Sequence, residues 1–289
     1  MQGKLCVVTG ANSGIGKTMA TDFARRGADV VLVCRNRSRG EAAMREIQSA
    51  TANTRVSLEL CDLGDLTSVR TCAAALRNLN RPIDVLANNA GLHLPARHLS
   101  PDGFEAMFAI NHLGPFLLTT LLLDRLHGAR VVTTSSLAHA IARIDWTNLQ
   151  CERRFSAMTQ YGVTKLANIL FTRELARRAR DQGVIATCFH PGGVATEFGQ
   201  DEPGILNTAM RLFGPYILRT PAQGADTGIW LATAPDAATL SGSYCQDRKV
   251  RTPWGQGAND NLAYELWTAS ERFTGLSGQA EATAARPSV

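Results

Sequence analysis

The stretch LCVVTGANSGIG, residues 5–16, joins an aliphatic run to a glycine-rich turn and then to a helical pattern. Leu5–Thr9 is predicted to be a buried strand, and residues 14–26 continue with the periodicity of a helix. Glycines at positions 10, 14 and 16 allow a tight turn and a close approach of the backbone to an anion. Such an anion would lie at the positive end of the helix dipole. The stretch therefore predicts a phosphate-binding turn at the start of a βαβ unit.

The rest of the chain repeats this alternation of strand and helix. Further strands are predicted at residues 29–34, 56–60, 83–87, 129–135 and 184–189. Helices between them are predicted at residues 39–50, 66–79, 101–126 and 158–181. The apolar runs of the strands do not alternate with polar residues, which is typical of strands that are buried on both faces. We therefore expect an α/β fold, a Rossmann-type doubly wound parallel sheet with helices on both faces.

A single domain is expected over residues 1–277, because no linker divides the chain. Residues 193–220 place glycine and proline irregularly after the sixth predicted strand, and we expect a substrate lid there. Residues 278–289 are rich in alanine and serine and are expected to form a disordered tail.

Composition narrows the class of protein. The 289 residues are 45% hydrophobic and 19% charged, as in ordinary globular proteins. The net charge is +5, but no Lys/Arg run is interleaved with aromatic residues, so no nucleic-acid partner is expected. Seven scattered cysteines without CxxC or metal-ligand spacing predict reduced core thiols and no metal site. No apolar run reaches the roughly 18 residues of a membrane span, and no signal peptide precedes the first strand. We therefore expect a cytoplasmic protein with no transmembrane segment.

The end of the second predicted strand indicates which dinucleotide would bind. Enzymes that prefer NAD place a carboxylate there to bind the ribose 2′-hydroxyl, whereas this chain has Cys34-Arg35-Asn36-Arg37. The planar guanidinium of Arg35 is suited to a 2′-phosphate. Lys17 and Arg37 are weaker candidates for the same role. NADP(H) is therefore the predicted cofactor.

Tyr161 and Lys165 lie four residues apart on a predicted helix and so share one face of it. A phenol with a pKa of about 10 is a poor acid–base catalyst near neutrality. A nearby ammonium stabilises the phenolate and lowers that pKa. The spacing alone is common on helices, so it gains weight only from the motifs that accompany it.

Those motifs are the glycine turn, Asn88–Gly91, Asn111 and the serine pair at 135–136, in that order along the chain. With them the sequence resembles the short-chain dehydrogenase/reductase family from about residue 3 to residue 267. Within that family it is similar to the retinol dehydrogenase branch, in residues 9–17, 34–35, 111–119, 135–139 and 165–175.

The resemblance implies four catalytic roles. Tyr161 would be the general acid in carbonyl reduction and the general base in the reverse reaction. Lys165 would lower the pKa of Tyr161 and bind the nicotinamide ribose. Ser136 would orient and polarise the substrate oxygen. Asn111 would hold a water in a proton relay.

The resemblance also implies a set of cofactor contacts. They are Gly10, Asn12, Ser13, Gly14, Ile15, Gly16, Arg35, Asp62, Leu63, Asn88, Ala90, Gly91, Tyr161, Lys165, Pro191, Gly192 and Thr196. Three histidines beside these motifs, His112, His139 and His190, are expected to be structural, and Asn168 is expected to cap or pack within its helix.

We therefore expect an NADP(H)-dependent oxidoreductase that interconverts a carbonyl and an alcohol on a small apolar substrate. The alternatives are a catalytically silent NADP(H)-binding regulator or scaffold, and a C=C reductase on the same fold. A homodimer or homotetramer through the helices at 101–126 and 158–181 is compatible with their apolar residues. Retinoid turnover is not carried over, because no membrane anchor precedes the glycine turn and residues 194–220 match no substrate-defined pattern.

Overall fold

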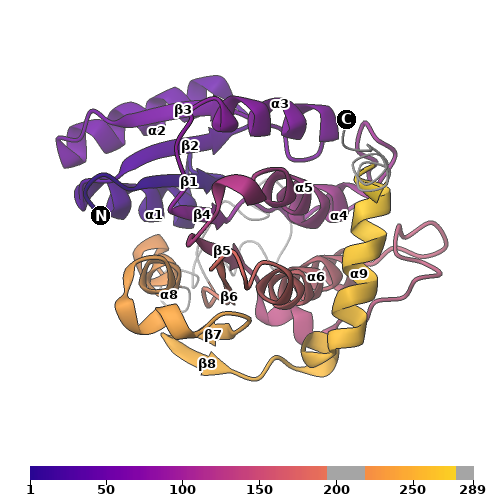
Figure 1. The fold of residues 1–289 in the computed structure, drawn as a ribbon. Helices are drawn as coiled ribbons and strands as arrows, with labels where there is room; N and C mark the ends of the chain where they lie inside the picture. Colours follow the sequence, from indigo (N-terminus) through magenta and orange to yellow (C-terminus); the bar gives the residue numbers. More distant parts are fainter. Residues whose placement is uncertain (194–218, 278–289) are drawn as a thin grey trace, which may run out of the picture.

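The computed structural model describes residues 1–193 and 219–277 and contains one mostly parallel sheet (Figure 1). The strand order is β3-β2-β1-β4-β5-β6-β7-β8, and within the described residues only β8 runs antiparallel to its neighbour. The strands are β1 Leu5–Thr9, β2 Asp29–Cys34, β3 Val56–Leu60, β4 Val85–Asn88, β5 Arg130–Thr134, β6 Ile185–Phe189, β7 Tyr244–Gln246 and β8 Lys249–Arg251. This arrangement confirms the predicted doubly wound α/β fold.

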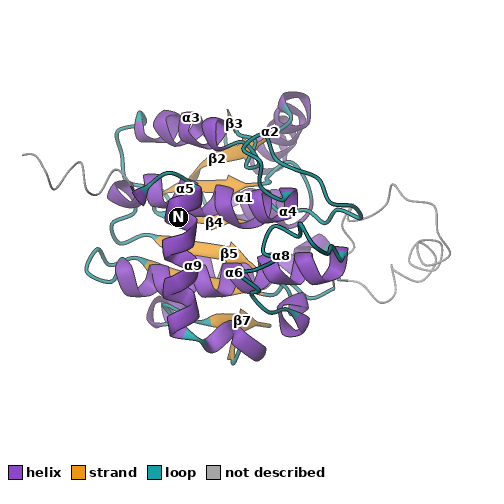
Figure 2. Cartoon of the chain, turned by 90° about the vertical axis from the view of Figure 1, so that its right-hand side faces the viewer, coloured by secondary structure: helices purple, strands orange, loops and turns teal. Residues whose placement is uncertain are grey.

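Helices cover both faces of the sheet (Figure 1). Their bounds are α1 Gly14–Arg25, α2 Arg37–Thr51, α3 Leu66–Arg77, α4 Ala106–Phe108, α5 Gly114–Leu121, α6 Ala157–Arg178, α8 Pro221–Thr233 and α9 Asp260–Phe273. Helices α1, α2 and α8 lie on one face, and α3, α5 and α6 lie on the other. Helix α9 packs against the outer side of α6, and Figure 2 shows it running across that side of the molecule.

Successive side chains of β1 enter two different hydrophobic cores. Cys6 and Val8 pack with Phe23 of α1 on one face, whereas Val7 packs with Phe116 of α5 on the other. All five residues of the strand are buried. A strand buried on both faces needs apolar residues at consecutive positions, which explains why the sequence shows no alternation.

The strand order reverses between β1 and β4, which pair in parallel at the centre of the sheet. The turns after these two strands meet at the carboxyl edge, where a Cβ on Gly10 would lie 2.9 Å from the Cα of Ala90. The hydroxyl of Thr9 accepts hydrogen bonds from the N–H groups of Asn89 and Ala90, each at 3.0 Å. Doubly wound folds bind their ligands at this kind of switch point.

The continuous helix predicted at residues 101–126 was wrong. A turn at 101–103 comes first, and the helix starts only at Ala106, where the carboxylate of Glu105 accepts hydrogen bonds from the N–H groups of Met107 and Phe108 at 2.9 Å each. A π-helical turn at Ala109–Leu113 then leads into α5. A 3₁₀ turn at Leu123–Arg125 follows α5. The positive φ of Gly103, +83°, explains why a regular helix cannot include the first turn.

The chain after β6 contains elements that the sequence pattern did not indicate, namely α8, the pair β7–β8, and α9. The predicted lid at 193–220 lies almost wholly outside the described residues. The predicted tail at 278–289 lies wholly outside them. All seven cysteines are buried and free, which agrees with the predicted core thiols. Across residues 1–193 and 219–277, no helix has the length and apolar character of a membrane span.

Candidate active site

The glycine turn after β1 has the shape of an anion cradle. Gly10 and Gly14 adopt φ values of +65° and +55°, which favour glycine. A Cβ on Gly16 would overlap the carbonyl oxygen of Gly10 and the amide of Asn89. Ser13 precedes α1 in an extended conformation and makes no side-chain cap bond, so its side chain does not cover the first N–H groups of the helix. Asn12 lies half-buried beside it, and the turn fits a diphosphate at a helix N-terminus.

Arg35 follows the last residue of β2 at the same edge of the sheet. Its side chain is 69% exposed, and its guanidinium lies 3.9 Å from the carboxylate of Asp62, which follows β3. The other candidate cations have closer or local partners, because Lys17 pairs with Glu46 and Arg37 lies 3.8 Å from Glu41 one turn along α2. Arg35 and Arg37 are equally exposed, so Arg35 is distinguished by its place directly after β2 at the edge where the glycine turn lies.

Residues 88–91 begin with the last residue of β4 and continue after it at the same edge of the sheet. The amide nitrogen of Asn88 donates to the hydroxyl of Thr119 at 2.9 Å, while its oxygen is buried without a hydrogen-bond partner. A Cβ on Gly91 would lie 3.1 Å from the Nζ of Lys165 and 3.3 Å from the Oδ1 of Asn111. A glycine at position 91 therefore leaves room beside the lysine ammonium.

The structure brings Ser136, Tyr161 and Lys165 together. Ser136 lies two residues after the end of β5, and Tyr161 and Lys165 lie on one face of α6. The side chains of Tyr161 and Ser136 share a hydrogen bond. The Nζ of Lys165 lies 5.4 Å from the centroid of the Tyr161 ring and donates to the carbonyl oxygen of Thr134 at 3.3 Å. A phenol, a hydroxyl and an ammonium thus lie close together at the carboxyl edge of the sheet.

Burial controls the protonation of this group. Desolvation raises the pKa of Tyr161 to about 12, and the hydrogen bond with Ser136 opposes that shift in part. The lowering of this pKa by Lys165 that the resemblance implied is not seen here, because burial of the phenol outweighs the other effects. Desolvation lowers the pKa of Lys165 to about 8. At neutral pH the phenol therefore carries its proton, while the ammonium stays charged in a poorly solvated position. A proton donor with a cation beside it is suited to placing a proton on a developing oxyanion.

Asn111 lies in the π-helical turn and is completely buried. Its Oδ1 accepts from the N–H of Leu92 at 2.8 Å, and its Nδ2 donates to the carbonyl of Leu92 at 2.8 Å and to the hydroxyl of Thr164 at 3.1 Å. The side chain thus fixes the loop after β4 against α6. Its role in a water relay stays a prediction.

Asp62 and Leu63 follow β3 as expected, with Oδ1 of Asp62 accepting from the N–H of Gly64 at 2.9 Å. After β6, Pro191 is half-buried and Gly192 has a φ of +85°, with the side chain of Arg219 lying against it. Thr196 lies outside the described residues.

Two of the three histidines contact backbone groups, and the third contacts a side chain. His139 Nδ1 donates to the carbonyl of Ser136 at 2.6 Å, and its Nε2 accepts from the N–H of Trp254 at 3.1 Å. His190 Nδ1 accepts from the N–H of Leu137 at 3.3 Å. His112 Nε2 lies 2.9 Å from the hydroxyl of Ser270. These contacts agree with the structural roles expected for them.

Sequence reasoning missed His93. Its ring meets that of Tyr161 edge-on, with the centroids 5.7 Å apart. Desolvation lowers its pKa, so the imidazole that faces the phenol is neutral at pH 7. No spacing rule marks this residue, because it enters the site only through the turn that follows β4. Thr9 and Asn89 lie inside the predicted motifs at residues 9–17 and 88–91, but the hydrogen bonds that join them were not predicted.

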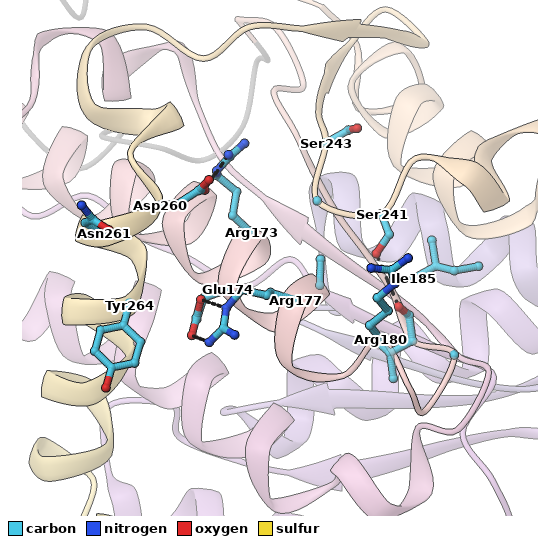
Figure 3. A pocket seen from close by; sticks show the side chains of 14 residues that line it. Arg173, Glu174, Arg177, Arg180, Ile185, Ser241, Ser243, Asp260, Asn261 and Tyr264 are labelled. Carbon is cyan, nitrogen blue, oxygen red and sulfur yellow. Dashed lines mark hydrogen bonds and ion pairs between the residues drawn. The ribbon is translucent and has the colours of Figure 1, made fainter.

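A second hollow lies apart from these residues, between the C-terminal half of α6 and the start of α9 (Figure 3). Its volume is about 1010 Å³. Arg173 pairs with Asp260 at 2.6 Å, and Arg177 pairs with Glu174 at 2.6 Å. These charges neutralise one another, and Figure 3 shows the pairs lying along the walls of the hollow. The chemistry is therefore concentrated at the carboxyl edge of the sheet.

Comparison with known proteins gives consistent matches over the whole domain. The family described as short chain dehydrogenase matches residues 4–204. Retinol dehydrogenase 12 from Mus musculus is 42% identical over 277 residues, which cover 95% of this chain and 87% of the relative. The crystal structure of an uncharacterized protein from Mycobacterium Paratuberculosis has a TM-score of 0.78 and 35% identity, covering 94% of both chains. A short chain dehydrogenase from Burkholderia cenocepacia, in complex with NADP, has a TM-score of 0.67 and 25% identity, covering 84% of this chain and 95% of its own.

Proposed function

Since the chain belongs to the short-chain dehydrogenase/reductase family, in its retinol dehydrogenase branch, we propose that it is an NADP(H)-dependent oxidoreductase. It would interconvert a ketone or aldehyde and the corresponding alcohol on an apolar substrate. The matches confirm the family that the motifs indicated. The observation that carries the proposal is the hydrogen-bonded pair of Tyr161 and Ser136 with the Lys165 ammonium beside it.

The residues at the carboxyl edge fit a dinucleotide with a 2′-phosphate. The turn at Gly10–Gly16 would hold the diphosphate at the N-terminus of α1. Arg35 would pair with the 2′-phosphate, since no carboxylate stands directly after β2 and its contact with Asp62 is long. The cofactor supplies the hydride when it is bound. The NADP complex of the relative from Burkholderia cenocepacia supports this choice of cofactor.

The chain's own residues would manage the proton. Ser136 would donate a hydrogen bond to the carbonyl oxygen of the substrate and orient it toward the Tyr161 phenol. As negative charge develops on that oxygen, the phenol proton transfers to it and the alcohol leaves. The Lys165 ammonium then stabilises the phenolate until Tyr161 regains a proton from solvent. In alcohol oxidation the same phenolate accepts the proton.

Apolar side chains around the serine support an apolar substrate. Leu137 and Ile141 lie on the 3₁₀ turn Leu137–Ile141 and are 49% and 65% exposed. Met158, three residues before Tyr161 on α6, is 53% exposed. Exposed apolar residues on the elements that carry Ser136 and Tyr161 favour an apolar ligand over a charged one.

The test is turnover of a panel of apolar ketones, aldehydes and enones with NADPH and with NADH, followed by loss of reduced-nicotinamide absorbance and by product analysis. The proposal expects oxidation of NADPH with formation of an alcohol. A saturated ketone as the product from an enone would replace it with the C=C reductase. Tight binding of NADPH without turnover of any compound in the panel would favour the regulator or scaffold.

A further inference from the structure

Asn168 lies one turn after Lys165 on α6 and is buried, with 3% of its surface exposed. Its amide nitrogen donates to the carbonyl oxygen of Thr134 at 3.1 Å. The ammonium of Lys165 donates to the same oxygen at 3.3 Å. One backbone carbonyl at the end of β5 therefore receives two side chains from α6.

This carbonyl stands two residues before Ser136, so its orientation affects the geometry of the reaction site. A second bond ties the same two elements, because the hydroxyl of Ser135 donates to the carbonyl of Lys165 at 2.9 Å. The end of β5 carries Ser136, and α6 carries Tyr161. Hydrogen bonds that join these two elements set the distance between the groups that must meet the substrate oxygen.

We propose that Asn168 is a positioning residue, because its amide holds the Thr134 carbonyl oxygen that also receives the Lys165 ammonium. A carbonyl oxygen that already accepts one hydrogen bond binds a second donor less strongly. Asn168 thus keeps the ammonium loosely anchored below Tyr161 instead of fully engaged with the backbone. The catalytic part of this inference rests on the proposed function, whereas the effect on Lys165 does not.

Within residues 1–193 and 219–277, few other charges act on this position. Tyr161, on the same helix, is a titratable group that contacts the ammonium. His112 lies on the side toward the π-helical turn. Burial lowers its pKa to about 4, so the imidazole is neutral. Its interaction with Asn168 opposes that shift only in part. From β5 and from the turn after β4, the neighbours are the uncharged carbonyl of Thr134 and Gly91.

The chain offers a direct way to observe Lys165, because it contains only four lysines, Lys4, Lys17, Lys165 and Lys249. In protein labelled with ¹³Cε-lysine, NMR would show four signals, and Lys165→Met would assign the buried one. The pKa of Lys165 would then be measured in the wild type, Asn168→Leu and Asn168→Asp. Leucine keeps the branched shape without the donor, and aspartate places a negative charge on the same oxygen cluster.

We expect Asn168→Asp to raise the pKa of Lys165 by about 1 or more, and Asn168→Leu to raise it by less. The matched control is Thr172→Val, one turn further along the buried face, whose hydroxyl donates to the Asn168 backbone carbonyl and interacts with Cys188 but does not contact the lysine anchor. It should leave the pKa unchanged. We also expect Asn168→Leu to lower kcat about tenfold or more with little change in KM for the cofactor.

An unchanged pKa of Lys165 in Asn168→Leu, in protein whose circular dichroism matches the wild type, would overturn the inference. Asn168→Leu also decides the question if Asn168→Asp does not fold. Failure of the proposed function gives a different result from failure of this inference. In that case the pKa of Lys165 would still change in the Asn168 variants, although neither the wild type nor any variant would turn over a substrate.

Discussion

Replacing Lys165 with methionine should stabilise the protein while it destroys activity. Lys165 is 2% exposed, and desolvation lowers its pKa from 10.5 to about 8. Each unit of that difference corresponds to about 1.4 kcal/mol, so the buried ammonium destabilises the folded state by about 3 kcal/mol at pH 7. Methionine has a similar length and no charge. The Thr134 carbonyl would keep the Asn168 amide as its donor.

The gain in stability should depend on pH in a defined way. Between pH 8 and 10.5 the unfolded chain binds the Lys165 proton more tightly than the folded chain does. The stability of the wild type therefore rises with pH across this window, relative to Lys165→Met. The advantage of the variant is full below about pH 8 and disappears as the pH approaches 10.5.

The assay is urea unfolding without cofactor at several pH values between 6 and 10, with Lys249→Met as the exposed control. The control should change the free energy of unfolding by less than about 0.5 kcal/mol at every pH. Two results would contradict this prediction: Lys165→Met less stable than the wild type at pH 7, or stabilised equally at pH 7 and pH 10. Either would mean that the buried ammonium does not destabilise the folded state.

Three further predictions concern the cofactor and the proton. Gly10→Ala should destabilise the fold by about 1–3 kcal/mol more than Gly103→Ala in thermal unfolding, and it should weaken NADPH binding. Both positions have positive φ, but only a side chain at position 10 would meet Ala90. Equal destabilisation by the two substitutions would contradict this close approach. Arg35→Ala should weaken NADPH binding by about 10- to 100-fold in a fluorescence titration and leave NADH unaffected, with Arg37→Ala as the milder control. Initial rates of alcohol oxidation should rise from pH 6 to about 7.5, where Lys165 keeps most of its charge, because the Tyr161 phenol with a pKa of about 12 must lose its proton first; a rate that fell over this range would assign the base elsewhere.

Most of the sheet and the catalytic pair could be predicted from the sequence for a physical reason. Strands buried on both faces require consecutive apolar residues, and β1 and β2 show that pattern plainly. The carboxyl ends of parallel strands lie at one edge of the sheet, so residues that follow strands, such as Arg35 and Ser136, could be placed at that edge without coordinates. Tyr161 and Lys165 share a face because of the helical period alone.

The remaining features depend on contacts between distant segments. The π-helical turn that carries Asn111 lies within an apolar stretch whose composition is that of a regular helix. His93 reaches Tyr161 only because the turn after β4 bends over α6. The carbonyl of Thr134 accepts hydrogen bonds from Lys165 and Asn168, which lie 31 and 34 positions further along the chain. No local pattern encodes these approaches, since tertiary packing produces them.

The most direct test of the central claim is to replace Tyr161 with phenylalanine, which removes the proton and keeps the ring. NADPH affinity should stay within about threefold of the wild type, while kcat for carbonyl reduction should fall by about a hundredfold or more. If the phenylalanine variant retained wild-type turnover with NADPH, Tyr161 would not be the proton donor, and the account of this site would be wrong.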